Sequence, residues 1–114
     1  MHKRITFKGM DHSSVLEDYA DRQLDKVIDF LKNERTPVYV DLVFEPSKVH
    51  AHHKIELRVK SPNYDRISNY EGTDFYHTLD RVIDVMYKEL HEEKKKRIDE
   101  RKMRGRHDDF KTQR

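Results

Sequence analysis

The stretch PVYVDLVFEPSKVHAHHKIELRVK, residues 37–60, decides the fold because it contains two strands joined by a turn. Apolar side chains occupy every second position from Val38 to Phe44, which is the pattern of a strand with one buried face. Residues 46–48 supply a turn, and the alternation then resumes as far as residue 60. Together these segments predict an antiparallel hairpin. The expected inward positions of its second strand are Val49, Ala51, Ile55, Leu57 and Val59.

The residues before this hairpin predict one strand and one helix. Residues 4–8 (RITFK) alternate between apolar and polar side chains, as a short half-buried strand does. Ser14 and Glu17 match the capping-box pattern that opens a helix. Apolar residues then recur at helical spacing, so this helix is expected to end at about Lys32.

The residues after the hairpin predict a weaker strand and a long helix. Residues 64–70 (YDRISNY) form the strand, and their pattern leaves its register open. Thr73 is expected to cap the helix, with Asp74 favourable in its first turn. Because no Pro or Gly interrupts the pattern before Gly105, the helix is expected to run for about 30 residues.

The element order is therefore β-α-β-β-β-α, which defines an α+β fold. Each strand has one apolar face and each helix has one apolar stripe. Two helices packed on one face of a four-stranded sheet bury all of these surfaces together. We expect a single domain over residues 1–104, followed by a flexible tail over residues 105–114.

The composition argues against an enzyme. The chain has no cysteine and only three glycines, so it offers neither a thiolate nor a Gly-rich phosphate loop. Its many carboxylates fall on solvent-facing positions, where their pKa values need not shift. We therefore expect no catalytic activity and no cofactor.

The N-terminal residues MHKRITFKGM are basic but lack a following apolar run, so they do not resemble a secretory signal. No stretch approaches the roughly 20 apolar residues that cross a bilayer. The simplest interpretation is a soluble cytoplasmic protein that has no membrane partner and is monomeric when free.

Positive charge is concentrated at the C-terminal end of the chain. Over residues 88–114, 11 Lys and Arg stand against 7 Asp and Glu, whereas residues 1–87 carry 13 against 15. On the last helix the apolar stripe ends at Leu90, and Lys and Arg occupy the same sector beyond it. This pattern predicts that the helix projects past the sheet and meets an anionic partner such as RNA.

The cations of the helix fall into two groups. Arg81, Lys88, Lys95 and Lys102 recur every seven residues on the side opposite the apolar stripe. Lys94, Arg97, Arg101 and Arg104 fall within the sector of the stripe. The alternative is a solvated helix laced by ion pairs such as Glu93–Arg97 and Glu100–Arg104. If the helix does bind RNA, replacing Arg97, Arg101 and Arg104 by Glu should abolish binding and leave the fold intact.

The outward face of the sheet is a second candidate surface. Lys54, Arg58 and Lys60 are its best candidates for RNA contact. Cross-strand pairing with Asp41, Glu45 or Glu56 would explain the same residues without RNA.

The sequence His50-Ala51-His52-His53 suggests a metal site only weakly. His50 and His52 share one face of a strand, whereas zinc usually requires three or four converging ligands. Surface histidines that contact RNA or solvent are the preferred interpretation, and we assign no metal. His53 is expected at the margin of the core or at a bulge.

Three short motifs carry a family resemblance. Residues 71–76 (EGTDFY), followed by Leu79-Asp80 and residues 82–84 (VID), resemble the opening of the last helix in ribosome hibernation-promoting factors. That family also includes ribosome-associated translation inhibitors and sigma-54 modulation proteins. Ile5-Thr6 in the first strand and the element order are similar too, and the resemblance covers roughly residues 3–96.

The resemblance implies a partner and a mechanism. Members of the family dock on 16S-type rRNA in the decoding region of the small ribosomal subunit, in the channel used by mRNA and tRNA. They hold idle ribosomes inactive during stress or stationary phase. The short chain leaves no room for the second domain with which long members pair two ribosomes, so we do not expect self-driven dimerisation of ribosomes.

We therefore expect a hibernation factor that inhibits translation by sterically excluding mRNA and tRNA. The alternative is a protein-binding regulatory module that acts through the first helix, whose Asp18, Asp21, Asp25 and Asp29 make it acidic. The candidate rRNA-binding residues are Lys54, Arg58, Lys60, Arg81, Lys88, Lys94, Lys95, Arg97, Arg101, Lys102 and Arg104.

Overall fold

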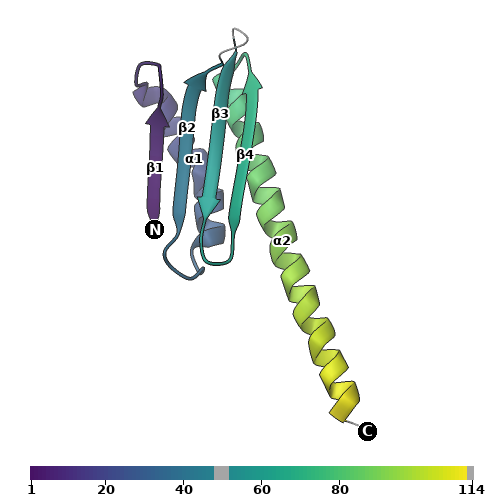
Figure 1. Cartoon of the computed structure of the whole chain (residues 1–114). Coiled ribbons are helices and arrows are strands. Elements are labelled where there is room, and N and C mark those ends of the chain that lie inside the picture. The colour runs from purple at the N-terminus through teal and green to yellow at the C-terminus, as the bar shows by residue number, and fades with distance from the viewer. Residues whose placement is uncertain (48–51, 113–114) are drawn as a thin grey trace.

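The computed structural model describes residues 1–47 and 52–112, with side chains described as far as Met103. Its element order confirms the predicted β-α-β-β-β-α arrangement and the α+β class. Both helices lie behind a four-stranded sheet in the view of Figure 1. The elements are β1 (His2–Phe7), α1 (Ser14–Leu31), β2 (Tyr39–Pro46), β3 (His53–Lys60), β4 (Asp65–Gly72) and α2 (Phe75–Thr112).

The sheet is mixed, with strand order β1-β2-β3-β4. β1 runs parallel to β2 because α1 carries the chain back across the sheet between them. β2, β3 and β4 pair in antiparallel fashion, which confirms the hairpin predicted for residues 37–60. The described part of its register places Tyr39 opposite Lys60 and Phe44 opposite Ile55. The expected inward residues Val49 and Ala51 lie outside the described residues.

The core fills the space between the sheet and the two helices. Alternate residues of β2 and β3 point into it, and the apolar stripes of α1 and α2 face them. Leu42, Phe44 and Leu57 are fully buried at the centre of the sheet. Among the described side chains of α2, the buried ones are Thr78, Leu79, Val82, Ile83, Met86 and Leu90.

The register of β4 is determined by contacts with α2. Ser68 is buried, and its hydroxyl donates a hydrogen bond to the backbone carbonyl of Val82 at 3.1 Å. Arg66 reaches the carboxylate of Glu93 on α2 at 3.0 Å. Ile67 therefore faces the open side of the sheet and stays 46% exposed. A polar residue turned inward and an aliphatic one turned outward explain why the sequence pattern left this register open.

Both helix caps lie one residue away from the predicted positions. Ser13, and not Ser14, caps α1, because its hydroxyl accepts a hydrogen bond from the backbone N–H of Leu16 at 3.3 Å. The capping box was therefore wrong, and Glu17 contacts His12 instead.

At the start of α2, Asp74 takes the role that the sequence gave to Thr73. The Asp74 carboxylate accepts a hydrogen bond from the backbone N–H of Tyr76 at 2.9 Å. Two neighbouring residues can both have side chains suited to capping, and the backbone conformation at the start of the helix determines which of them is the N-cap.

α2 continues to Thr112, beyond the expected end near residue 104. Gly105 does not end the helix, because one glycine inside a helix costs only about 1 kcal/mol relative to alanine. The helix has 38 residues and the molecule's longest dimension is 67 Å. Within the described part of the chain, no helix is apolar enough over a sufficient length to span a membrane.

Candidate nucleic-acid interface

The C-terminal part of α2 projects past the lower edge of the sheet (Figure 1), as the change from apolar to basic residues predicted. Leu90 is the last buried residue of the helix among those with described side chains. From residue 94 to residue 103, which we call the overhang, six Lys and Arg stand against Asp99 and Glu100. The overhang therefore presents a cationic rod to solvent.

Three of these cations turn back toward the base of the domain. Lys94, Arg97 and Arg101 border a cavity of about 300 Å³, which we call the basal pocket. The C-terminal end of α1 and the turn before β4 form its other sides. Phe30, Glu34 and Tyr64 are among the residues that these segments contribute to its lining.

Arg97 makes contacts within the fold as well as facing the pocket. Its guanidinium lies 4.7 Å above the centre of the Tyr64 ring and donates a hydrogen bond to the carbonyl of Asn63 at 2.7 Å. The carboxylate of Glu93 lies 3.5 Å from the same group, which is one of the ion pairs of the alternative interpretation. A charge reversal at Arg97 would therefore remove packing contacts as well as a positive charge, and that the triple replacement leaves the fold intact stays a prediction.

The cations that recur every seven residues do not form one continuous surface. Lys88, Lys95 and Lys102 are exposed on the side of α2 away from the sheet, with no ion pair to any described side chain. Arg81 instead stacks on the ring of Tyr70 at 4.3 Å, beside β4. The side chain of Arg104 lies outside the described residues.

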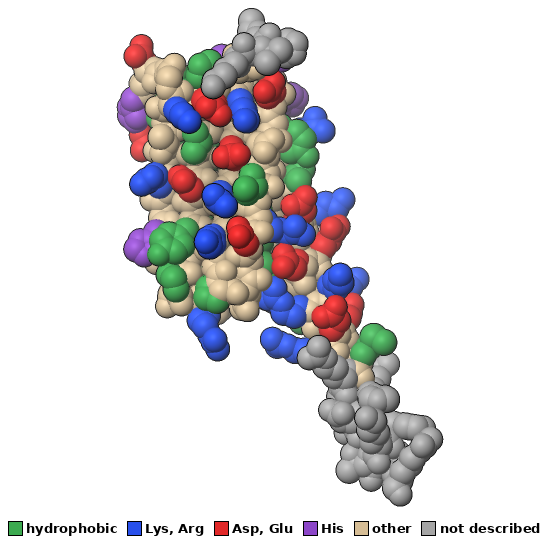
Figure 2. Space-filling model, viewed as in Figure 1, with side chains coloured by type: hydrophobic (Ala, Val, Ile, Leu, Met, Phe, Trp, Pro, Cys, Tyr) green, Lys and Arg blue, Asp and Glu red, His purple; other side chains and the backbone are tan. Residues whose placement is uncertain are grey.

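The cations of β3 lie on the opposite side of the molecule from the helices. Figure 2 shows this open sheet face, on which Lys and Arg alternate with Asp and Glu. Lys54 pairs with Glu45 at 3.7 Å, so cross-strand ion pairing accounts for it without RNA. Arg58 lies opposite Asp41, whereas Lys60 lies opposite Tyr39 at the end of β3 nearest the basal pocket.

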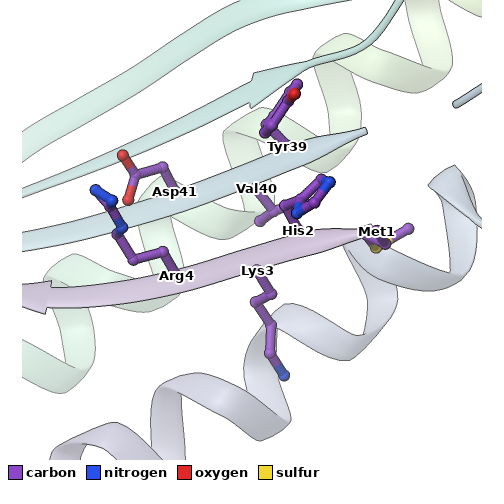
Figure 3. Close-up of a pocket in the computed structure, with 7 residues that line it drawn as sticks. All are labelled: Met1, His2, Lys3, Arg4, Tyr39, Val40 and Asp41. Atoms are coloured by element: carbon purple, nitrogen blue, oxygen red, sulfur yellow. The ribbon is translucent and has the colours of Figure 1, made fainter. Parts of the chain in front are cut away.

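One corner of the open face contains a group that the sequence analysis did not single out. His2 and Tyr39 stack with ring centres 4.9 Å apart, next to Arg4 and Asp41, around a cavity of about 620 Å³ (Figure 3). Lys3 points the other way, toward α1, where it pairs with Asp21. The parallel pairing of β1 with β2 brings His2 opposite Tyr39. The alternation of residues 4–8 predicts a strand but does not reveal which strand it pairs with, so the sequence alone does not predict this corner.

The acidic first helix is partly engaged with its neighbours. Lys26 pairs with Asp84, and the Tyr19 hydroxyl donates a hydrogen bond to Asp80 at 2.9 Å. The Asp80 hydrogen bond, together with burial, raises the pKa of Tyr19 above its ordinary value. The acids without an ion pair to a described side chain include Asp25 and Asp29, which are exposed.

The histidines near β3 do not assemble a metal centre in the part of the chain that the structure describes. Within residues 1–47 and 52–112, no three His, Asp or Glu side chains converge to hold a metal ion. His50 lies outside the described residues, and His52 is half-buried. His53 stacks on Phe75 with ring centres 3.7 Å apart, at the margin of the core where the sequence placed it.

Comparisons with known proteins agree with this architecture. The family model described as "Sigma 54 modulation protein / S30EA ribosomal protein" matches residues 4–98. The N-terminal domain of Protein Y from Thermus thermophilus superposes with a TM-score of 0.64 at 15% identity, covering 79% of this chain and 96% of that one. A ribosomal subunit interface protein from Coxiella burnetii superposes with a TM-score of 0.65 at 21% identity, covering 82% and 98%. No curated protein sequence matches the chain.

Proposed function

The chain belongs to the sigma 54 modulation protein / S30EA ribosomal protein family, and from this premise we propose that it is a ribosome-associated hibernation factor. It binds the small ribosomal subunit near the decoding centre and excludes mRNA and tRNA by occupying their channel. It performs no covalent step. Its place of action is the cytoplasm, where ribosomes translate.

The observation that carries the proposal is the overhang of α2. A helix that continues beyond its own core gains little apolar burial there, and six cations over ten residues repel one another in solution. Contact with the RNA backbone would remove that repulsion and release bound counterions. The charge repulsion that is unfavourable in the free protein is therefore relieved when the overhang binds the ribosome.

The shape of the molecule suits exclusion by occupancy. The chain extends over 67 × 27 × 18 Å, so it is narrow and elongated, with α2 along its length. A rigid body of this kind in an RNA-walled channel blocks other occupants without a conformational change. Phosphate contacts along the helix fix its position, since they set orientation without reading sequence.

Co-sedimentation with purified small subunits tests the proposal directly. We expect stoichiometric binding at low salt, competition by mRNA or tRNA, and loss of binding at higher salt because phosphate contacts dominate. Absence of the protein from the subunit fraction at low salt would refute the ribosomal assignment.

A paired charge reversal locates the surface. Arg101→Glu with Lys102→Glu changes two exposed cations of the overhang, and neither pairs with a described side chain. We expect weaker subunit binding and a salt dependence (log affinity against log salt) whose slope falls by about 2 or more. The control is Lys8→Glu with Arg22→Glu, an equal charge change on exposed residues elsewhere. Equal effects of the two pairs would show that net charge, and not the overhang, drives binding.

A protein-binding role for α1 is the second candidate function. Val15 is 68% exposed at the start of this helix, and Asp25 and Asp29 carry no ion pair to a described side chain. Asp25→Lys with Asp29→Lys is the clean test, because Asp21 is already paired with Lys3. If these changes abolish inhibition of cell-free translation but leave subunit binding unchanged, a protein partner on α1 is the functional contact.

A further inference from the structure

We propose that the basal pocket binds a single unstacked RNA nucleotide whose base carries an amino group, with the base inside the pocket and its phosphate at the rim. The inference rests on the proposed function, since the nucleotide would belong to the RNA that surrounds the bound protein. It adds a specific subsite to an interface that is otherwise electrostatic.

The walls of the pocket suit a flat aromatic ligand. Phe30 from the end of α1, Tyr64 from the turn before β4 and Ile98 from α2 line the same cavity of about 300 Å³. Ile98 remains 40% exposed although it lies on a helix that buries other aliphatic residues. Aromatic and aliphatic walls of this kind hold bases that have left the RNA stack.

The rim of the pocket suits a phosphate. Among its lining residues, Lys94, Arg97 and Arg101 are cationic and Glu34 is the one acid. The Lys94 ammonium lies 5.4 Å above the centre of the Phe30 ring, so a charge stands directly beside an aromatic wall. Arg101 is exposed and pairs with no described side chain, which leaves its guanidinium available.

The pocket offers one strong hydrogen-bond acceptor, the carboxylate of Glu34. Tyr64 is 2% exposed, and the Glu34 carboxylate lies near its hydroxyl. Burial, together with the nearby Glu34 carboxylate, raises the pKa of Tyr64, so the hydroxyl keeps its proton. One carboxylate oxygen of Glu34 accepts a hydrogen bond from the Asn63 amide at 3.1 Å.

The acid in the pocket selects among the bases. An ionised carboxylate only accepts hydrogen bonds and has about four acceptor sites, so Glu34 favours a base with an exocyclic amino group. Adenine, cytosine and guanine carry one. Uracil presents carbonyl oxygens on both sides of its one N–H, and a carboxylate repels them. The pocket should therefore discriminate against uracil.

The pocket exists before any ligand enters. The Tyr64 ring, the Asn63 carbonyl and the Glu93 carboxylate hold Arg97 in place, so its plane is already oriented. A ligand that meets a formed site loses little affinity to ordering of the protein.

Binding of short RNA probes to the full chain tests the inference. The probes are fluorescein-labelled heptauridylate and the same heptamer with a central cytidine or a central adenosine, measured by fluorescence anisotropy at fixed salt. All three carry the same phosphate charge, so any difference comes from the base. We expect the substituted probes to bind about tenfold more tightly, as one hydrogen bond to a charged group gives. Equal affinities for the three probes would overturn the proposal.

Glu34→Gln separates base recognition from charge. Gln can donate as well as accept, so we expect it to remove most of the discrimination while heptauridylate still binds. The matched control is Glu92→Gln, an exposed carboxylate of α2 with no ion pair to a described side chain. A Glu92→Gln protein that loses discrimination to the same degree would overturn the assignment to the pocket.

The same proteins, tested for co-sedimentation with small subunits, separate the two proposals. Normal co-sedimentation without base discrimination would refute the pocket and leave the ribosomal role standing. Base discrimination without co-sedimentation would refute the ribosomal role and leave the pocket as a nucleotide site.

Discussion

The two halves of α2 share one helix and differ in what supports them. From Phe75 to Leu90 the helix packs on the sheet and contributes the residues that complete the core. From residue 94 onward the same sector carries Lys94, Arg97 and Arg101. The helix continues through this change, while its neighbours change from the buried core to the basal pocket and solvent.

The difference shows how one element can serve both stability and binding. Apolar burial stabilises the first half, because each buried aliphatic side chain contributes roughly 1.5–3 kcal/mol. The overhang has no buried aliphatic side chain among those described, and a partly exposed ion pair such as Glu93–Arg97 contributes about 1 kcal/mol or less. Substitutions in the first half should therefore change unfolding, and those at the fully exposed cations of the overhang should change binding.

The largest expected effect on stability comes from Ile83→Ala. Ile83 is 1% exposed in the packed half, so the truncation leaves a cavity and should lower the free energy of unfolding by about 2–5 kcal/mol. Ile98→Ala is the matched control, with the same change on the same helix, and should stay within about 0.5 kcal/mol. Urea unfolding followed by circular dichroism measures both. Similar losses for the two proteins would mean that the halves do not differ as described.

A second change tests where the packed half begins. A Cβ atom at Gly72 would lie 2.2 Å from the Thr78 hydroxyl oxygen, so Gly72→Ala forces the Thr78 side chain or the start of α2 to shift. We expect a loss of about 1–3 kcal/mol in urea unfolding, as overpacking usually costs. Adding Thr78→Ala should recover part of that loss, because it removes the atom that clashes. A Gly72→Ala protein as stable as the parent would show that this approach is not tight.

A third change tests where the packed half ends. Arg97→Ala removes the hydrogen bond to the Asn63 carbonyl and the contact with the Tyr64 ring, and should cost about 1–2 kcal/mol. Lys95→Ala, two residues away and exposed, should change the free energy of unfolding by less than about 0.5 kcal/mol. If both proteins unfold like the parent, the supported part of α2 ends before Arg97.

The smallest expected effect is a pH dependence of stability that arises at the contact between α1 and α2, where Tyr19 bonds to Asp80. The folded-state pKa of Tyr19 is raised above the ordinary value of about 10, first by its hydrogen bond to Asp80 and then by burial. Its contribution to stability is therefore fully present below pH 10 and is lost as the pH rises through the folded-state pKa.

Tyr19→Phe removes this dependence. We expect the parent to be more stable than the variant at pH 8 and the gap to close as the pH is raised past 10, in thermal unfolding monitored by circular dichroism. Comparison with Tyr39→Phe, which changes an exposed tyrosine of β2 away from the contact between the helices, corrects for the general effects of high pH. A gap that stays constant up to pH 11 would contradict the assigned cause.

Much of the fold could be predicted from local patterns. Alternation in residues 37–60 predicted the hairpin, and the apolar stripe ending at Leu90 predicted the projecting helix. The caps were each missed by one residue, because Ser13 and Ser14, like Thr73 and Asp74, have similar capping chemistry. The surface was harder to predict, since exposure alone does not determine which cations the fold already uses.

The sequence by itself determined the element order, the buried face of β2 and β3, and the point at which α2 loses its apolar support. These follow from periodicity, because a side chain's face is fixed by its position within one element. Only the tertiary structure decided which candidate residues share a surface. Lys54 lies in a cross-strand ion pair away from the helix cations, and Arg97 packs on the ring of Tyr64. Phe30 and Tyr64 line the basal pocket together with Arg101. The reason is physical: these relations join residues far apart in the chain, and the packing of the elements alone brings them within reach.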